Sequence, residues 1–496
     1  MSRGVVIFGS LIAALILIGL LAWNPSPTST TASHQEPLLL YCAAGLKPAV
    51  EPAIRDYEQQ TGRKVQVQYG GSGTLLSNLK VAKVGDLFLA ADGFFLDLAR
   101  SNDLLREVIP IARMTPVIAV ARGNPKQIRG LADLLRTDVR LVLANPEAAA
   151  IGRLTRDALE SRQGWRTFAD RALALKTTVN DLANDLKLGA ADVTFLWDAN
   201  LSQYPELEAL PDRPFPDLAS EVAIGVLPFS RQPRQALHFA RFLGARDRGL
   251  RHFQAHGYVA VEGDLWVETP ELVFYSGGVN RLAIEDTLRR FEDREGVKIT
   301  RVYNGCGILT AQIRAGQKPD GYFACDVSFM RTVQDDFRPS FELADTRMVI
   351  ATPKDNPRAL KQLADLGRPG LKIGVANEQQ SALGALTADL LRRHQLFDRV
   401  MSNVVVQTPT ADLLVNQLRV GGLDAVVVYE VNTRQVADQI GVQPIDLPGA
   451  TAIQPVAIGR TTSHPRLMER LLSALRSAES RQRFKDAGFH WRDTQP

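Results

Sequence analysis

The chain repeats its own sequence at a spacing of about 230 residues, and this repeat constrains the fold more than any single motif does. Residues 38–46, LLLYCAAGL, correspond to residues 271–279, ELVFYSGGV, and five further blocks pair in the same order. Internal repeats are examined first because they set the architecture. We therefore expect two copies of one fold, at residues 37–262 and 270–491, with a boundary near 262–269.

Each copy alternates apolar strands with amphipathic helices, which is the pattern of an α/β domain. The first helix of each copy runs up to a glycine, Gly62 or Gly296, a common C-terminal stop. Strand–helix alternation predicts parallel sheets with helices on both faces. Ligands bind such sheets beyond the carboxyl ends of the strands, so the strand-to-helix turns are the candidate sites.

Two of these turns in each copy are rich in small residues. The second turn contains G-x-G, as YGGSGTL at residues 69–75 and as YNGCGIL at residues 303–309. A helix start exposes unpaired N–H groups and the positive end of the helix dipole, which favours anions without a formal charge. The alternative is that Gly and Ser only build tight turns. GGSGTL lacks the Lys that a nucleotide-hydrolysing loop needs.

The N-terminal segment is apolar. Residues 4–23 carry no charge, and twenty such residues match a bilayer core of roughly 30 Å. Arg3 precedes the run, so we expect an N-terminal transmembrane helix with the rest of the chain outside the cytoplasm. Residues 24–36, rich in Pro, Ser and Thr, are expected to form a flexible linker. The alternative is a cleaved signal segment within residues 1–23; both interpretations place the chain on the periplasmic face of the inner membrane or in the periplasm.

Other features of the sequence exclude several functions. A net charge of +4 over 496 residues, with no dense Lys/Arg run, gives no reason to expect nucleic acid. Three cysteines are too few for a disulfide scaffold, and we expect Cys42 in the core. His252 and His256 lack a third ligand, so we expect no metal site there, and no catalytic motif is present, so we expect no cofactor and no enzyme. Asp92 and Asp326 follow matching strands and are expected to cap helices.

The first copy resembles the periplasmic molybdate-binding proteins of ABC importers. The resemblance rests on YCAAGL, YGGSGTL, GDLFLAAD, ANPEAAAIG and FLWDAN, in that order, and covers nearly all of residues 37–260. The second copy matches the same pattern more weakly over residues 271–491. The resemblance implies two type II periplasmic-binding-protein folds, each of two α/β lobes with a hinge and a cleft. It also implies capture of a tetrahedral oxyanion, molybdate or tungstate, for a membrane permease.

The resemblance also places the family's ligand contacts on residues of this chain. In the first copy it implies a hydroxyl contact from Ser72 and backbone contacts at Gly45, Ile151 and Leu182, while the family's tyrosine falls on Trp197. Gly45 stands where the family has serine, so only a backbone donor remains there. Trp197 can offer only an indole N–H. In the second copy the same positions are Gly278, Cys306, Leu383, Leu413 and Tyr429.

The two cysteines of the second copy have three interpretations. Cys306 replaces the serine of the second turn, and Cys325 ends the next strand, so both are expected at one rim of the cleft. They could form a disulfide, which export permits. They could bind a soft metal or belong to a redox-sensitive site. They could also be two small packed residues.

The sequence therefore predicts a hinged binding protein whose lobes close over an anion. The lobe crossings are expected near residues 114–125 and 221–230 in the first copy, and near 347–357 and 450–460 in the second. The expected partners are the oxyanion and an ABC permease. The alternative is a membrane-tethered sensor or scaffold in which one or both copies are degenerate or bind another ligand. An enzyme that uses Cys306 as nucleophile would need an adjacent base, and the sequence supplies none.

Overall fold

The computed structural model describes residues 36–162, 164–215 and 217–492. The expected transmembrane helix over residues 4–23 and nearly all of the expected linker lie outside the described residues. Within the described ranges, no helix is both long enough and apolar enough to cross a membrane.

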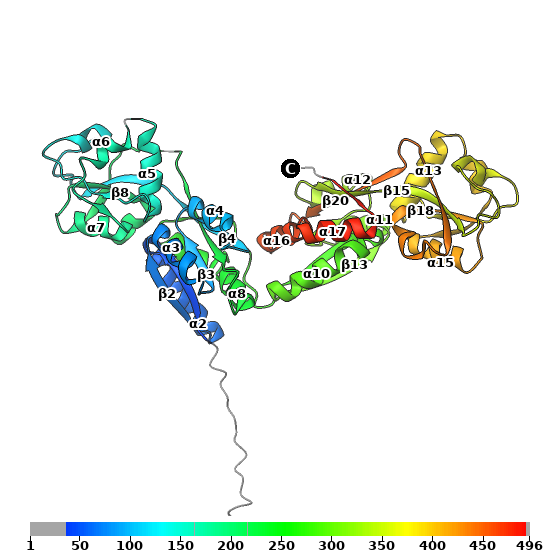
Figure 1. Ribbon diagram of the computed structural model, residues 1–496, viewed down its shortest axis with the longest axis horizontal. Helices are drawn as coiled ribbons and strands as arrows, with labels where there is room; N and C mark the ends of the chain where they lie inside the picture. The colour runs from blue at the N-terminus through cyan, green and yellow to red at the C-terminus, as the bar shows by residue number, and fades with distance from the viewer. Residues whose placement is uncertain (1–35, 163, 216, 493–496) are drawn as a thin grey trace, which may run out of the picture. The chain divides into compact units, whose positions relative to one another are not determined.

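Lobe A of the first copy, residues 38–114 and 220–260, is built on a six-stranded sheet in the order β11-β4-β10-β3-β1-β2 (Figure 1). Strand β1 pairs in parallel with β2 and β3, whereas β10 runs antiparallel to β3 and β4. The sheet is thus mixed, because a strand that returns from the other lobe enters it in the opposite direction. Its elements are β1 (Leu38–Ala43), η1 (Ala44–Leu46), α2 (Lys47–Thr61), β2 (Val65–Gly70), α3 (Ser72–Ala82), β3 (Leu87–Ala90), α4 (Gly93–Ser101), β4 (Val108–Met114), β10 (Ser220–Val226), α8 (Pro233–Leu243), α9 (Gly249–Ala255) and β11 (Val259–Ala260).

Lobe B of the first copy, residues 116–210, holds a three-stranded sheet in the order β8-β5-β9 and the parallel pair β6-β7. Its helices α5, α6 and α7 gather around β8 (Figure 1). The elements of lobe B are β5 (Pro116–Ala121), η2 (Leu131–Leu135), β6 (Leu143–Ala144), α5 (Ala150–Glu160), α6 (Trp165–Ala169), β7 (Leu175–Lys176), α7 (Val179–Lys187), β8 (Val193–Trp197), η3 (Asp198–Gln203) and β9 (Leu207–Ala209).

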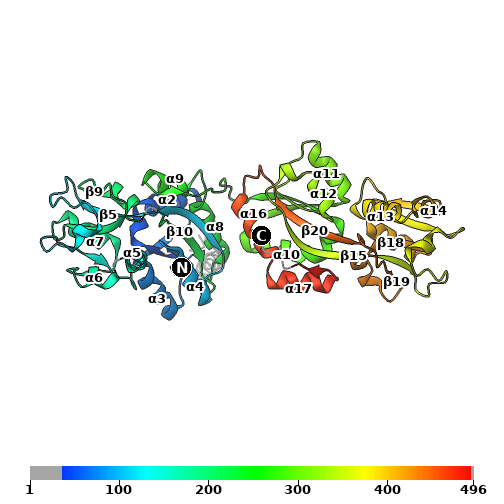
Figure 2. The ribbon, with the colours of Figure 1, turned by 90° about the horizontal axis from the view of Figure 1, so that it is seen from above.

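The second copy repeats this order of elements around one ten-stranded sheet. Lobe A, residues 271–347 and 451–491, contains β12 (Glu271–Gly277), η4 (Gly278–Asn280), α10 (Arg281–Glu295), β13 (Lys298–Asn304), α11 (Cys306–Arg314), β14 (Gly321–Phe323), α12 (Val327–Arg331), η5 (Gln334–Asp336), β20 (Thr451–Ile458), α16 (Pro465–Leu475), α17 (Ala478–Ala487) and β21 (His490–Trp491). Helices α10, α16 and α17 pack together in this lobe (Figure 2).

Lobe B of the second copy, residues 348–445, is entered by β15 (Phe341–Pro353), the strand shared by both lobes. The remaining elements are η6 (Leu363–Gly367), β16 (Ile373–Ala376), α13 (Ala382–Arg393), α14 (Phe397–Met401), β17 (Val404–Thr408), α15 (Ala411–Arg419), β18 (Ala425–Tyr429), η7 (Glu430–Asn432), η8 (Arg434–Val436) and β19 (Ile440–Pro444).

The crossing between the lobes differs in the two copies. In the second, β15 pairs with β20 up to Arg347 and with β18 from Met348, so one strand passes through both lobes (Figure 1). In the first, the chain breaks at Thr115 between β4 and β5. Pro116 opens β5, and proline has no N–H to continue a ladder. The expected crossing at 114–125 is confirmed. Strand β10 (Ser220–Val226) covers much of the second expected crossing at 221–230 but pairs only with strands of lobe A, so the chain returns from lobe B before this strand begins.

The expected helix ends and caps are confirmed. Gly62 and Gly296 end α2 and α10 with φ of 70° and 67°, the left-handed conformation that glycine adopts without steric cost. Asp92 caps α4 by accepting hydrogen bonds from the N–H groups of Phe94 and Phe95, and Asp326 accepts one from the N–H of Ser328.

Candidate functional site

The first copy contains a small cavity of about 20 Å³ between its two lobes. A cavity needs roughly 10–15 Å³ to admit the centre of one water molecule, so the lobes are nearly closed. The cavity is lined by Ala43, Ala44, Gly45, Leu46, Gly70, Gly71, Ser72, Ala91, Met114, Ala149, Ala150, Ile151, Thr178, Val179 and Trp197. No residue of this set is charged.

Four helix starts meet at this cavity. Lobe A contributes the first turn of η1 and of α3, and lobe B contributes the first turns of α5 and α7. Each helix start presents N–H groups and the positive end of its dipole. The cavity is therefore suited to an anion held by neutral donors.

Ser72 is the side chain best placed to contact such an anion. It opens α3 and is 1% exposed, and its Oγ accepts a hydrogen bond of 3.2 Å from the N–H of Ala91. Because that bond uses an oxygen lone pair, the hydroxyl hydrogen stays available for an acceptor in the cavity.

Four of the five ligand positions predicted for the first copy line the cavity: Gly45, Ser72, Ile151 and Trp197. Leu182 does not line it, because it lies in the fourth position of α7 and is fully buried, while Thr178 and Val179 reach the cavity instead. Sequence reasoning missed Thr178, the N-cap of α7. Its signal was present, because Thr178 and Asp181 form a capping box that marks the helix start.

Gly45 has a steric reason to lack a hydroxyl side chain. A Cβ at Gly45 would lie 2.8 Å from Cγ1 of Val179, across the cleft. Its carbonyl oxygen accepts hydrogen bonds from the Nδ2 of Asn200 and the hydroxyl of Tyr258. A serine at position 45, as in the molybdate-binding proteins that this copy resembles, would thus collide with lobe B in this closed arrangement.

The two glycines of G-x-G serve lobe closure. A Cβ at Gly71 would lie 2.3 Å from the carbonyl oxygen of Ala148, and one at Gly73 would lie 2.0 Å from that of Glu147. The N–H of Gly73 donates to Ala148 O at 2.9 Å, across the cleft. In the second copy the N–H of Gly307 donates to Gln380 O at 3.0 Å. Both motifs let the start of a lobe A helix touch the backbone of lobe B.

The second copy places its predicted residues at equivalent elements. Gly278 opens η4, Cys306 opens α11, and Leu383 is the second residue of α13. Leu413 lies on α15 and is 47% exposed. A Cβ at Gly278 would come no closer than 3.8 Å to Thr410, so this position has room that Gly45 lacks.

Tyr429 is a buried polar side chain in lobe B of the second copy. It ends β18, is 2% exposed, and its hydroxyl has no hydrogen-bond partner among the described residues. Burial, with a smaller effect of the Asp326 carboxylate, raises the pKa of Tyr429 well above its ordinary value. The hydroxyl therefore stays protonated and can donate to a ligand.

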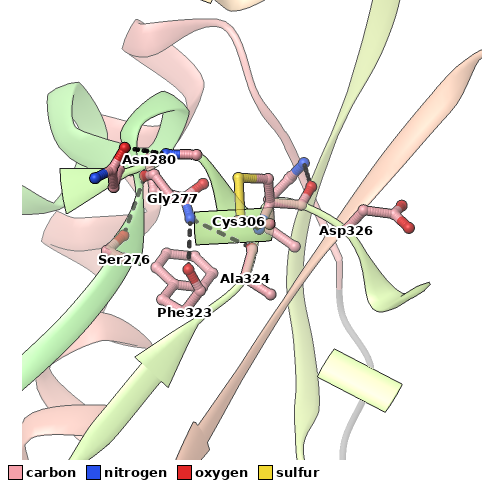
Figure 3. The surroundings of a disulfide bond; sticks show 12 residues. Ser276, Gly277, Asn280, Cys306, Phe323, Ala324 and Asp326 are labelled. Carbon is pink, nitrogen blue, oxygen red and sulfur yellow. Dashed lines mark hydrogen bonds between the residues drawn. A yellow bond between two sulfur atoms is a disulfide. The ribbon is translucent and has the colours of Figure 1, made fainter. Parts of the chain in front are cut away.

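Cys306 and Cys325 form a disulfide, which selects the first of the three interpretations (Figure 3). The described residues include no group of three or more metal-ligating side chains, so the soft-metal interpretation has no support there. The bond joins the start of α11 to Cys325, the second residue after β14. The N–H of Cys325 donates to Sγ of Cys306 at 3.0 Å, as the N–H of Ala91 donates to Ser72.

Three positions differ together between the copies. A Cβ at Gly277 would lie 2.1 Å from Sγ of Cys325, so the disulfide requires glycine there. The first copy has Ala44 at that position, with Ser72 and Ala91 in place of the cysteines. The bridge thus lies where the first copy has its hydroxyl donor, and a disulfide sulfur has no hydrogen to donate. The second turn of this copy has lost that contact.

The remaining candidates have structural roles. Cys42 is buried without a disulfide, as expected for a core residue. Nε2 of His252 pairs with Oδ2 of Asp56 at 2.7 Å, and Nδ1 of His256 contacts the carbonyl oxygen of His252.

Comparisons with known proteins identify related binding proteins. The sequence model of a family described as bacterial extracellular solute-binding protein matches the chain twice, at residues 38–259 and 272–490. The molybdate-binding protein ModA of Mycobacterium tuberculosis is 28% identical over 245 residues, which are 47% of this chain and 91% of that protein. A binding protein of Haemophilus influenzae is 30% identical over 223 residues, 45% of this chain and 90% of that protein. The solved structure of the periplasmic molybdate-binding protein of Azotobacter vinelandii has a TM-score of 0.40 at 19% identity, and covers 45% of this chain and 99% of that one.

The two matches to the family together span most of the chain and fall on the two copies. They confirm the duplication that the sequence predicted. The chain belongs to the family of bacterial extracellular solute-binding proteins, as a tandem of two copies.

Proposed function

We propose that the chain captures a tetrahedral oxyanion of the molybdate and tungstate class in its first copy and delivers it to an ABC importer. The observation that carries the proposal is the uncharged cavity at four helix starts, with the Ser72 hydroxyl as a donor. A dianion gains from dipoles and N–H groups that point at it from several directions. The relatives named as molybdate-binding proteins support the choice of ligand.

The same proposal places the protein outside the cytoplasm. Disulfides persist in oxidising compartments and are rare in the cytosol. The Cys306–Cys325 bridge therefore supports a periplasmic location, in agreement with the extracellular family.

The second copy is proposed to bind a different ligand, or the same class more weakly. Its disulfide removes the donor of the second turn, while Tyr429 keeps a buried donor that Trp197 replaces in the first copy. Of the two hydroxyl side chains that the resemblance implies, the first copy thus keeps the serine, Ser72, and the second copy keeps the tyrosine, Tyr429.

Calorimetric titration of the full chain in mild detergent tests the proposal, with molybdate, tungstate, sulfate and phosphate as ligands. Ser72→Ala should weaken molybdate binding by about 10- to 100-fold, since a hydrogen bond to a charged group contributes roughly 1.5–3 kcal/mol. Ser77→Ala is the matched control, because Ser77 lies on the same helix and its hydroxyl donates to Gly73 O within that helix. If the parent chain binds none of the four oxyanions at micromolar concentration, the proposed ligand class is wrong.

A further inference from the structure

Arg153 joins the two lobes of the first copy beside the cavity but does not line it. It lies on α5 of lobe B, two residues after Ile151. Its Nη2 pairs with Oδ2 of Asp92 in lobe A at 2.7 Å, and its guanidinium carbon lies 4.3 Å from the ring centroid of Phe94, also in lobe A. One side chain thus makes two contacts across the cleft.

The Arg153–Asp92 pair is buried in the closed form, and opening of the lobes would expose its charges to water. The side chains are 16% and 1% exposed. The other oxygen of Asp92 is used to cap α4, so in the closed form Arg153 is the cation that balances this carboxylate. A buried charge without its partner is costly, and opening of the lobes would return it to water. Without Arg153 the Asp92 carboxylate would be buried without a cation in the closed form, so loss of Arg153 favours the open form. Arg153 itself has a second partner within α5, Asp157 at 2.7 Å, which does not depend on the cleft.

The charge of Asp92 also bears on the anion. Asp92 directly follows Ala91, which lines the cavity. The Asp92 carboxylate is thus one residue away from the cavity lining and would repel a dianion bound there. The positive charge of Arg153 offsets that repulsion, although Arg153 does not line the cavity.

The second copy lacks this pair. Asp326 occupies the position of Asp92, but Ala385 stands where Arg153 would be. Oδ2 of Asp326 instead accepts a hydrogen bond of 3.3 Å from the N–H of Ile453. None of the ion pairs formed by the described residues involves Asp326.

We propose that Arg153 is a positioning residue that holds the first copy closed before ligand arrives, and that the second copy lacks this latch. A binding-competent form that is already populated raises the apparent affinity in proportion to its population. Arg153 should therefore strengthen ligand binding from outside the cavity; this part rests on the proposed function, whereas the effect on closure does not.

Lobe closure is measured without ligand, from the distance between spin labels on Val81→Cys in lobe A and Leu188→Cys in lobe B. Both positions are exposed, by 88% and 79%, while the native Cys42 is fully buried. In the full chain, Arg153→Ala should lower the closed-to-open ratio by about tenfold or more. Arg156→Ala is the matched control, because Arg156 lies on the same helix and its ion pairs stay within lobe B, with Glu147 and Asp157.

A second variant tests the same ion pair in case Arg153→Ala does not fold. Asp92→Asn removes the charge but keeps an oxygen to cap α4, since Asn is as good an N-cap as Asp. It should open the lobes in the same direction as Arg153→Ala but less, because Arg153 keeps Asp157 as a partner, and Arg153→Lys should restore part of the closed population. An unchanged distance distribution in Asp92→Asn and in any folded Arg153→Ala would overturn the latch. Molybdate titration of the same variants is a separate result: absence of binding in the parent chain would count against the proposed function, while the distances still decide the latch.

Discussion

Replacement of Gly73 by alanine should weaken closure of the two lobes while lobe A stays folded. Gly73 is the second residue of α3, and a Cβ there would lie 2.0 Å from Glu147 O and 2.9 Å from its carbonyl carbon. Both atoms are backbone, so the lobes must move apart by about 1 Å or more to reach an ordinary contact of roughly 3.4 Å or more. Within lobe A alone, alanine is a better helix former than glycine by about 1 kcal/mol. The new Cβ would also lie 3.1 Å from Cε1 of Phe95 within lobe A, a close contact that a shift of a few tenths of an ångström in that ring relieves. The substitution should therefore leave lobe A folded and oppose mainly the closed form.

The loss can be worked out from the contacts across the cleft. The N–H groups of Gly73 and Thr74 donate to Ala148 O at 2.9 and 3.3 Å, and both bonds would break as the lobes separate. At about 1 kcal/mol each, closure loses about 2 kcal/mol, or about 30-fold in the closed-to-open ratio, and apparent molybdate affinity falls by up to that factor.

The assay is calorimetric titration of the full chain with molybdate, beside circular dichroism to show that the fold is kept. Gly93→Ala is the matched control, since Gly93 opens α4 and a Cβ there meets nothing within 4 Å. If Gly73→Ala binds molybdate within twofold of the parent chain and leaves the ligand-free distance between the labels at positions 81 and 188 unchanged, the G-x-G motif does not limit closure and the reasoning is wrong.

Three further predictions follow from individual contacts. Thiol titration of the unfolded, unreduced chain should find one free thiol, Cys42, and reduction of the Cys306–Cys325 bridge should destabilise the second copy by about 3 kcal/mol, measured as a lower unfolding temperature. Tyr429→Phe should leave ligand-free stability unchanged or higher, because it removes a buried hydroxyl without a partner, yet weaken any ligand of the second cleft in calorimetry; a stability loss above about 1 kcal/mol would contradict this. Burial, followed by the charge of Arg241, lowers the pKa of His238 to about 3 from 6.5, so the unfolded chain binds a proton that the folded chain does not. Stability should fall by up to about 1.4 kcal/mol per unit as pH drops from about 6.5 toward 3, and chemical unfolding of His238→Phe should show a flatter profile.

The candidate site was predictable where it depends on local sequence. Ser72, the small residues around it and the caps at Asp92 and Asp326 lie at strand-to-helix turns, and the order of neighbouring residues specifies such turns. Leu182 does not line the cavity, whereas Thr178 and Val179 at the start of α7 do, because spacing along the chain does not show which N–H groups of a helix face a cleft. The pairing of Cys306 with Cys325 remained one of three interpretations until the structure brought both sulfurs to one rim.

The sequence by itself determined the duplication and the alternation of strand and helix, because both are patterns of consecutive residues. It also indicated the anion-binding turns, since small residues before a helix are visible in one dimension. Only the tertiary structure decided what closes the cleft. Arg153 and Asp92 are 61 positions apart, and Gly73 meets Ala148 from the other lobe. Such contacts depend on how two lobes fold against each other, and no periodicity of the chain encodes them.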